Sequence, residues 1–99
     1  MNKHSTSFEE FMIRNLQDEE SAKEFLNVSL ESYIEDGNFE EFLRSLELVI
    51  KARQSVSAFA KEANINRGHL YAIFKNQKTP RFDTILNILA KLGFSLKVA

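Results

Sequence analysis

Apolar residues recur at helical spacing through most of this chain, and a residue that can cap a helix precedes most of these runs. Asp18, Asn38 and Ser55 each stand before a segment in which apolar side chains repeat every three or four residues. Such side chains accept a hydrogen bond from the first amides of a helix, and the stripe behind them buries one helix face. Gly37 supplies a left-handed helix stop. With one Pro and three Gly in 99 residues, the pattern predicts an all-α fold.

The same signals predict five to six helices and their approximate bounds. A capping box at Ser7 predicts the start of the first helix. The expected helices cover residues 8–15, a stretch after Asp18, 39–53, 56–63, 67–75 and 82–92. Residues 94–98 then alternate apolar and polar side chains, which predicts a short C-terminal β-strand. The aromatic residues expected in the core are Phe39, Phe42, Phe59, Phe74 and Phe82.

The charges divide the chain into two halves of opposite sign. Residues 1–50 hold four Lys/Arg against twelve Asp/Glu, whereas residues 51–99 hold nine Lys/Arg against two Asp/Glu. A basic half suits a polyanion such as nucleic acid. An acidic half suits a basic protein partner or simply a solvated surface. We therefore expect an acidic N-terminal helical region, residues 1–53, and a DNA-binding region, residues 54–99, within one compact unit.

Several functional classes are disfavoured by what the chain lacks. It has no Cys, its only histidines are His4 and His69, and no Gly-rich phosphate loop is present. We therefore expect no enzyme activity, no catalytic residue, no cofactor and no metal site. No apolar run is long enough to span a membrane, and the N-terminus lacks the apolar stretch of a signal peptide. A cytoplasmic location without a membrane partner is the expectation.

Two short helices joined by a tight turn predict a helix-turn-helix of the lambda-repressor-like type in the basic half. Ala60 is small enough for the second helix to cross the first, and Asn64 tolerates a positive φ in the turn. Ile65 is positioned to fill the core, while Leu70, Ile73 and Phe74 form the buried stripe of the second helix. The outward side of that helix would enter the major groove of double-stranded DNA.

The polar and basic residues on and beside these two helices are the candidate DNA contacts. They are Ser57, Asn66, Arg67, His69, Tyr71, Lys75, Lys78 and Arg81. Arg67 has the geometry to pair with guanine, and the flanking cations suit phosphates. Asn66 suits an adenine edge but is equally needed as a helix cap. The alternatives are a solvated surface for the cations and a packing role for Tyr71.

The stretch from Ala52 to Leu96 resembles a known family, the addiction-module antidote proteins. The similarity rests on the motifs "AKEA", "HLYAIFK", "TPRFDTIL" and "LAKLGFSL". Many Xre-like repressors share such a helix-turn-helix segment, and the earlier "GNFEEFLRSLELVIKAR" is what points to this family in particular. The resemblance covers about residues 8–98. Asn64, Asn66 and Gly68 depart from the family's usual residues at their positions.

The resemblance implies a type II antitoxin with two activities. The chain would neutralise a small basic toxin of the RelE/ParE superfamily, and it would bind operator DNA as a homodimer to repress its own operon. The negative half suits a basic toxin through charge complementarity. The alternative is an Xre-type transcriptional regulator that has no toxin partner.

Overall fold

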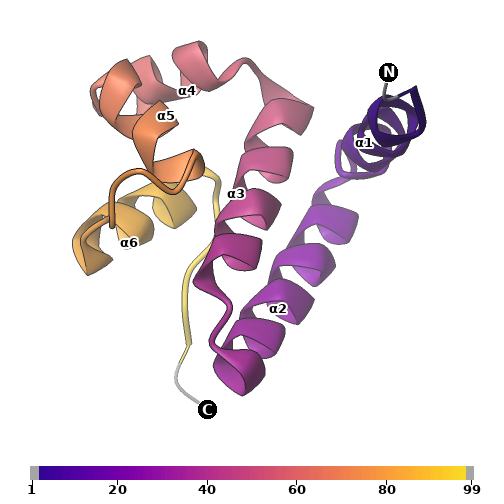
Figure 1. Cartoon of the computed structure of the whole chain (residues 1–99), viewed down its shortest axis with the longest axis horizontal. Coiled ribbons are helices and arrows are strands. Elements are labelled where there is room, and N and C mark those ends of the chain that lie inside the picture. The colour runs from indigo at the N-terminus through magenta and orange to yellow at the C-terminus, as the bar shows by residue number, and fades with distance from the viewer. Residues whose placement is uncertain (1–2, 98–99) are drawn as a thin grey trace. The chain divides into compact units, whose positions relative to one another are not determined.

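The computed structural model describes residues 3–97, and side chains from residue 8 onward. The described residues form six helices and no strand. The helices are α1 (Lys3–Asn15), α2 (Glu19–Asp36), α3 (Phe39–Arg53), α4 (Val56–Glu62), α5 (Arg67–Phe74) and α6 (Phe82–Lys91) (Figure 1). The all-α prediction of five to six helices is confirmed. None of the helices in the described part of the chain is long and apolar enough to cross a membrane.

Backbone contacts divide the chain after Gln54 into two compact units. We call them the N-terminal unit, which contains α1, α2 and α3, and the C-terminal unit, which contains α4, α5 and α6. Each unit has its own buried apolar residues.

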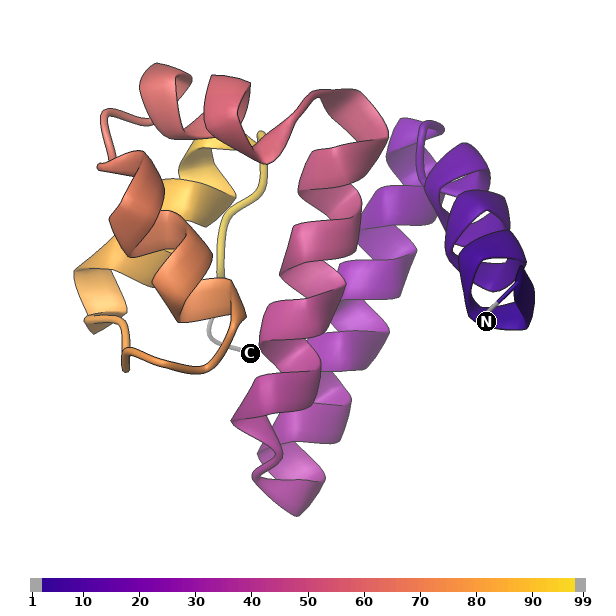
Figure 2. The ribbon, with the colours of Figure 1, turned by 45° about the horizontal axis from the view of Figure 1, so that its top comes forward.

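The N-terminal unit is built on an antiparallel pair of helices, α2 and α3, with α1 packed on α3 (Figure 2). Both long helices start at the predicted caps. The Asp18 carboxylate accepts a hydrogen bond from the Ser21 amide at 2.9 Å, and the Asn38 side chain accepts one from the Glu41 amide at 3.2 Å. Gly37 ends α2 with φ at +71°, as expected for a left-handed stop.

The apolar stripe of α3 forms most of the buried core of this unit. Its buried members are Phe42, Leu43, Leu46, Val49, Ile50 and Ala52. Leu16, Ala22 and Leu26 add buried side chains from the first two helices and their connection. Near the connection between α2 and α3, the ring of Tyr33 lies 5.4 Å from that of Phe39, centroid to centroid. These contacts explain why a strongly acidic segment folds into a helical unit.

An ion-pair network joins α1 to α3. Lys51 lies 3.3 Å from a Glu9 carboxylate oxygen and 3.6 Å from one of Glu47. Partial burial lowers the pKa of Lys51, but the charge of Glu47 and the hydrogen bond to Glu9 outweigh it, so this pKa is raised above its ordinary value. Lys51 therefore stays charged at neutral pH.

The C-terminal unit holds three shorter helices around a core of its own. Ser55 caps α4 by accepting a hydrogen bond from the Ala58 amide at 3.0 Å, as predicted. The buried side chains are Val56, Phe59, Ala60, Ala63, Leu70, Ile73, Ile85, Ile88, Leu89 and Leu92. All three helices contribute side chains to this core, and α4 packs directly against α5.

Three expectations from the sequence are wrong. Helix α1 begins at Lys3, so Ser7 lies inside the helix and does not cap it. Phe82 was expected in the core but is 70% exposed, because it is the first residue of α6 and precedes the part of that helix that packs. The predicted strand at 94–98 is absent from the described residues 94–97, and Val98 lies outside them.

The absence of the strand has a local cause. Gly93 has φ at +90° and ends α6, and the Phe94 amide donates back to the Leu89 carbonyl at 2.9 Å. This bond closes the helix end in the manner of a Schellman motif. The first amide of the expected strand is therefore used by the helix, and no neighbouring strand is available in the described chain to pair with the residues that follow.

Candidate nucleic-acid interface

The connection between α4 and α5 is held in a single conformation by backbone hydrogen bonds. The Ala63 amide donates to the Phe59 carbonyl at 2.8 Å, and the Ile65 amide donates to the Ala60 carbonyl at 2.8 Å. Between them, Asn64 adopts φ of +59°, the left-handed conformation expected from its type. The turn is thus built from the residues that the sequence indicated, and α5 leaves it in a defined direction.

The first turn of α5 is organised around a cap. The Asn66 side-chain oxygen accepts a hydrogen bond from the His69 amide at 2.9 Å. A Cβ atom added at Gly68 would lie 3.3 Å from that same oxygen, closer than an ordinary van der Waals contact. Gly68 therefore leaves room for the cap, a role that we did not expect from the sequence.

Three of the candidate DNA contacts form an exposed row along α5. Arg67, Tyr71 and Lys75 follow one another at intervals of four residues, and all three are exposed. Residues at this spacing lie on the same side of a helix. On the side of α5 that faces the core, Leu70 and Ile73 are fully buried. Among the described residues, no ion pair engages either cation of this row, so both charges remain available.

The other candidates are distributed around this row. Lys78 is exposed in the connection after α5, and Ser57 is half-buried in the first turn of α4. Arg81 is exposed but lies 3.2 Å from a carboxylate oxygen of Asp83. This pair partly neutralises a charge that the sequence suggested for phosphate contact. Because both groups are exposed, the pair is weak and can open.

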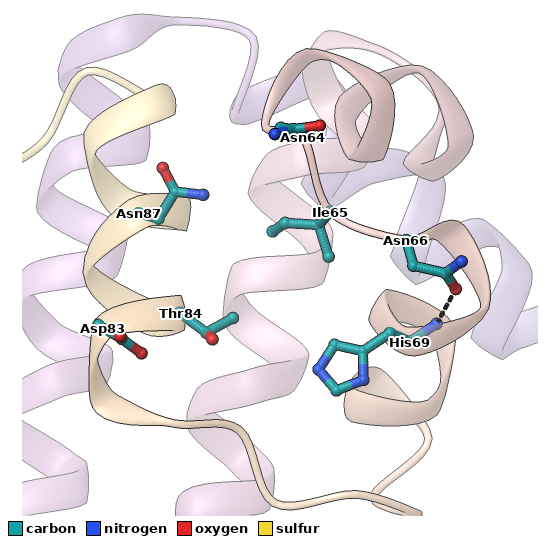
Figure 3. Close-up of a pocket in the computed structure, with 7 residues that line it drawn as sticks. All are labelled: Asn64, Ile65, Asn66, His69, Asp83, Thr84 and Asn87. Atoms are coloured by element: carbon teal, nitrogen blue, oxygen red, sulfur yellow. Dashed lines mark hydrogen bonds between the residues drawn. The ribbon is translucent and has the colours of Figure 1, made fainter.

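A shallow polar hollow lies between the start of α5 and α6 (Figure 3). It is lined by Asn64, Ile65, Asn66, His69, Asp83, Thr84 and Asn87. The ring of His69 points into it, so this half-buried side chain faces α6 as well as the outside. No group of three or more His, Cys, Asp or Glu residues in the described chain has a geometry that could hold a metal ion.

One residue of this hollow connects α6 to the turn. The side-chain amide of Asn87 donates a hydrogen bond to the Ala63 carbonyl at 3.1 Å. Ala63 is buried and ends α4, so this carbonyl needs a partner that water cannot easily supply. Asn87 therefore anchors the connection that aims α5. The sequence did not predict this role, because the partner of Asn87 is a backbone carbonyl, which every residue type has.

Comparisons with known proteins give one match. A family model described as "Probable addiction module antidote protein" matches residues 6–99 of the chain. Neither a curated protein nor a solved structure shows significant similarity to it.

Proposed function

The chain belongs to the family of probable addiction module antidote proteins, and we propose that it neutralises a small basic toxin of the RelE/ParE superfamily and represses its own operon. Membership of an antidote family implies a toxin partner and favours this function over that of an Xre-type regulator without a toxin. On this proposal the chain acts by binding its partners and not as an enzyme.

We assign operator binding to the C-terminal unit, with α4 and α5 acting as a helix-turn-helix. The observation that carries this assignment is the exposed row Arg67, Tyr71 and Lys75, whose two cations are unpaired among the described residues. Lys78 lies just beyond this row. In such motifs the N-terminal residues of the second helix reach base edges, while flanking cations contact phosphates. Arg67 accordingly reads a base, and the lysines position the helix on the duplex.

The salt dependence of DNA binding tests this assignment. With about four phosphate contacts per subunit of a homodimer, the logarithm of the binding constant falls with that of salt concentration at a slope of roughly −7. The measurement is fluorescence anisotropy with duplex DNA from upstream of the coding sequence, at several salt concentrations. Binding that does not respond to salt would contradict a phosphate-based interface.

We expect the chain to bind its operator as a homodimer, because of the small number of base pairs that one C-terminal unit can contact. One helix-turn-helix contacts only a few base pairs, so useful specificity needs two half-sites related by symmetry. Sedimentation with and without operator DNA measures the stoichiometry. Only monomers at high concentration, both free and on DNA, would overturn the dimer.

The antidote function is tested by co-expression with the protein encoded by the adjacent reading frame. We expect a stable complex on co-purification and rescue of cells from growth arrest by the adjacent product. Survival without this chain, together with the absence of a complex, would reduce the proposal to operator binding alone.

A further inference from the structure

Helix α1 carries apolar side chains on more of its circumference than it buries. Towards its C-terminal end, Met12 and Ile13 are half-buried, and Leu16 directly after the helix is buried. Phe8, one turn before Met12, and Phe11 beside it are 63% and 55% exposed. Packing within the N-terminal unit thus accounts for the first group and leaves two phenyl rings uncovered.

The two rings form one surface. Phe8 and Phe11 are three residues apart on a helix, which makes them neighbours on its outside. The other large apolar residues exposed in the described N-terminal unit are Val28 and Ile34, which are aliphatic and six residues apart. Adjacent exposed aromatic side chains are the groups that most often anchor protein interfaces. We call Phe8 and Phe11 the α1 aromatic pair.

The charges around this pair decide what kind of partner fits it. Residues 8–20 hold five Asp/Glu, one of which, Glu9, is paired with Lys51, against Arg14 as the cation of this stretch. The Asp18 carboxylate accepts hydrogen bonds from the Ser21 hydroxyl and amide, which lower its pKa and keep it ionised. The stretch that carries the aromatic pair therefore has a net negative charge at neutral pH.

This charge argues against a second copy of the chain as the occupant. Two copies that met through the α1 aromatic pair would bring these carboxylates together, and like charges across an interface are unfavourable. A partner with Lys and Arg around an apolar groove gains from both features. A helix that inserts aromatic residues into such a groove is a recurrent mode of recognition.

We propose that the toxin of the module docks on the α1 aromatic pair, with Phe8 and Phe11 in an apolar groove and the carboxylates of residues 9–20 attracting basic residues of the toxin. This inference rests on the proposed antidote function and adds the surface through which it acts. It separates the two activities on the chain, since the toxin would be held by α1 and the operator by α5.

The test compares two double variants of the full chain. Phe8→Ala with Phe11→Ala removes the aromatic pair, and Val28→Ala with Ile34→Ala removes two apolar side chains of similar exposure, 60% and 74%, from α2. Titration calorimetry with the purified product of the adjacent reading frame measures affinity. We expect about 100-fold weaker binding for the first variant, as for two interface anchors, and less than about threefold change for the second.

A charge variant and a measurement on the wild type support the comparison. Glu10→Lys should slow association and lose its effect at high salt, whereas Glu40→Lys at the start of α3 should change association less. Amide hydrogen exchange in the wild-type complex should slow in α1. That measurement needs no variant, so it answers the question even if the double variant folds poorly.

The outcomes separate the surface from the function. A wild-type chain that binds no such toxin would overturn the antidote proposal and this surface together. Tight wild-type binding that survives loss of the α1 aromatic pair, or unchanged exchange in α1, would overturn the surface alone. A variant that becomes monomeric while keeping its toxin affinity would reassign the pair to self-association and overturn the proposal.

Discussion

The two units of this chain reach a stable helical fold in different ways. The N-terminal unit uses helices of 13, 18 and 15 residues, whereas the C-terminal unit uses helices of 7, 8 and 10 residues. In the N-terminal unit most of the buried side chains come from one long helix, α3, whereas in the C-terminal unit each of the three short helices contributes two or three. Short helices are marginal by themselves, and they depend on caps, turns and individual hydrogen bonds. The comparison teaches that a unit of short helices needs buried side chains from every helix, whereas a unit of long helices can be built mainly on one of them.

The units also differ in what they present to solvent. The N-terminal unit holds six Lys/Arg and twelve Asp/Glu, and the C-terminal unit holds seven Lys/Arg and two Asp/Glu. The carboxylates and exposed phenyl rings of the N-terminal unit suit a protein partner, whereas the cations beside α5 in the C-terminal unit suit a DNA duplex. A small chain can thus carry two unlike surfaces, because each is built on its own core.

The largest effect is expected from a cavity in the core of the C-terminal unit. Leu70→Ala removes a side chain that is fully buried in the C-terminal unit, and we expect a loss of about 2–5 kcal/mol in the free energy of unfolding. Urea denaturation followed by circular dichroism measures it. Leu96→Ala, at an exposed Leu of the same unit, is the control and should cost far less. Equal losses in the two variants would mean that Leu70 is not part of a packed core.

The helix starts and stops were predictable because they depend on residues close in sequence. The predicted caps Asp18, Asn38, Ser55 and Asn66 accept the hydrogen bonds of their helices, each from an amide three residues later. Ser7 shows the limit of this reasoning. Its hydroxyl has the right spacing for a cap, but the helix continues on its N-terminal side, and a motif of four residues contains no information about that.

The failures arise where distant parts of the chain decide the outcome. Phe82 has the spacing of a core residue, but helical spacing defines a side of α6 and not how far neighbouring helices extend along it. Asn87 reaches a carbonyl 24 residues away, which no local pattern predicts. The alternation at 94–98 is typical of a strand, but strands need partners, and the Phe94 amide is committed to Leu89.

The next largest effect concerns the exposed row of α5. Arg67→Ala should weaken operator binding by about 1–3 kcal/mol and relax specificity at one base position, since a bidentate contact with a base is lost. Lys78→Ala should weaken binding to all sequences alike and reduce the salt slope by about 1. Competition anisotropy with single-base variants of the operator distinguishes these results. An equal loss for Arg67→Ala on every sequence would assign its guanidinium to a phosphate.

A smaller effect is expected from the anchor of the turn. Asn87→Asp keeps the shape of the side chain but removes the donor, which leaves the buried Ala63 carbonyl without its partner at a cost of roughly 1–2 kcal/mol. Asn87→Ala removes the donor without adding charge. We expect both variants to lose amide protection at Ile65 by hydrogen exchange and to discriminate operator from unrelated DNA less well. Loss of protection in the Asp variant alone would indicate an effect of charge and not of the missing hydrogen bond.

The smallest effect belongs to the exposed ion-pair network of the N-terminal unit. Lys51→Met removes the pairs with Glu9 and Glu47, and because the groups remain partly hydrated, we expect a loss of less than about 1 kcal/mol at neutral pH. The pKa of Lys51 is raised above its ordinary value of 10.5, so folding favours the protonated amine. Its contribution is fully present below that ordinary value and disappears as the pH rises through the higher folded pKa. Urea denaturation of both proteins should therefore show a constant difference from pH 7 to about 10 that vanishes at higher pH. A difference that keeps its full size in strong alkali would show that the charge of Lys51 does not stabilise the unit.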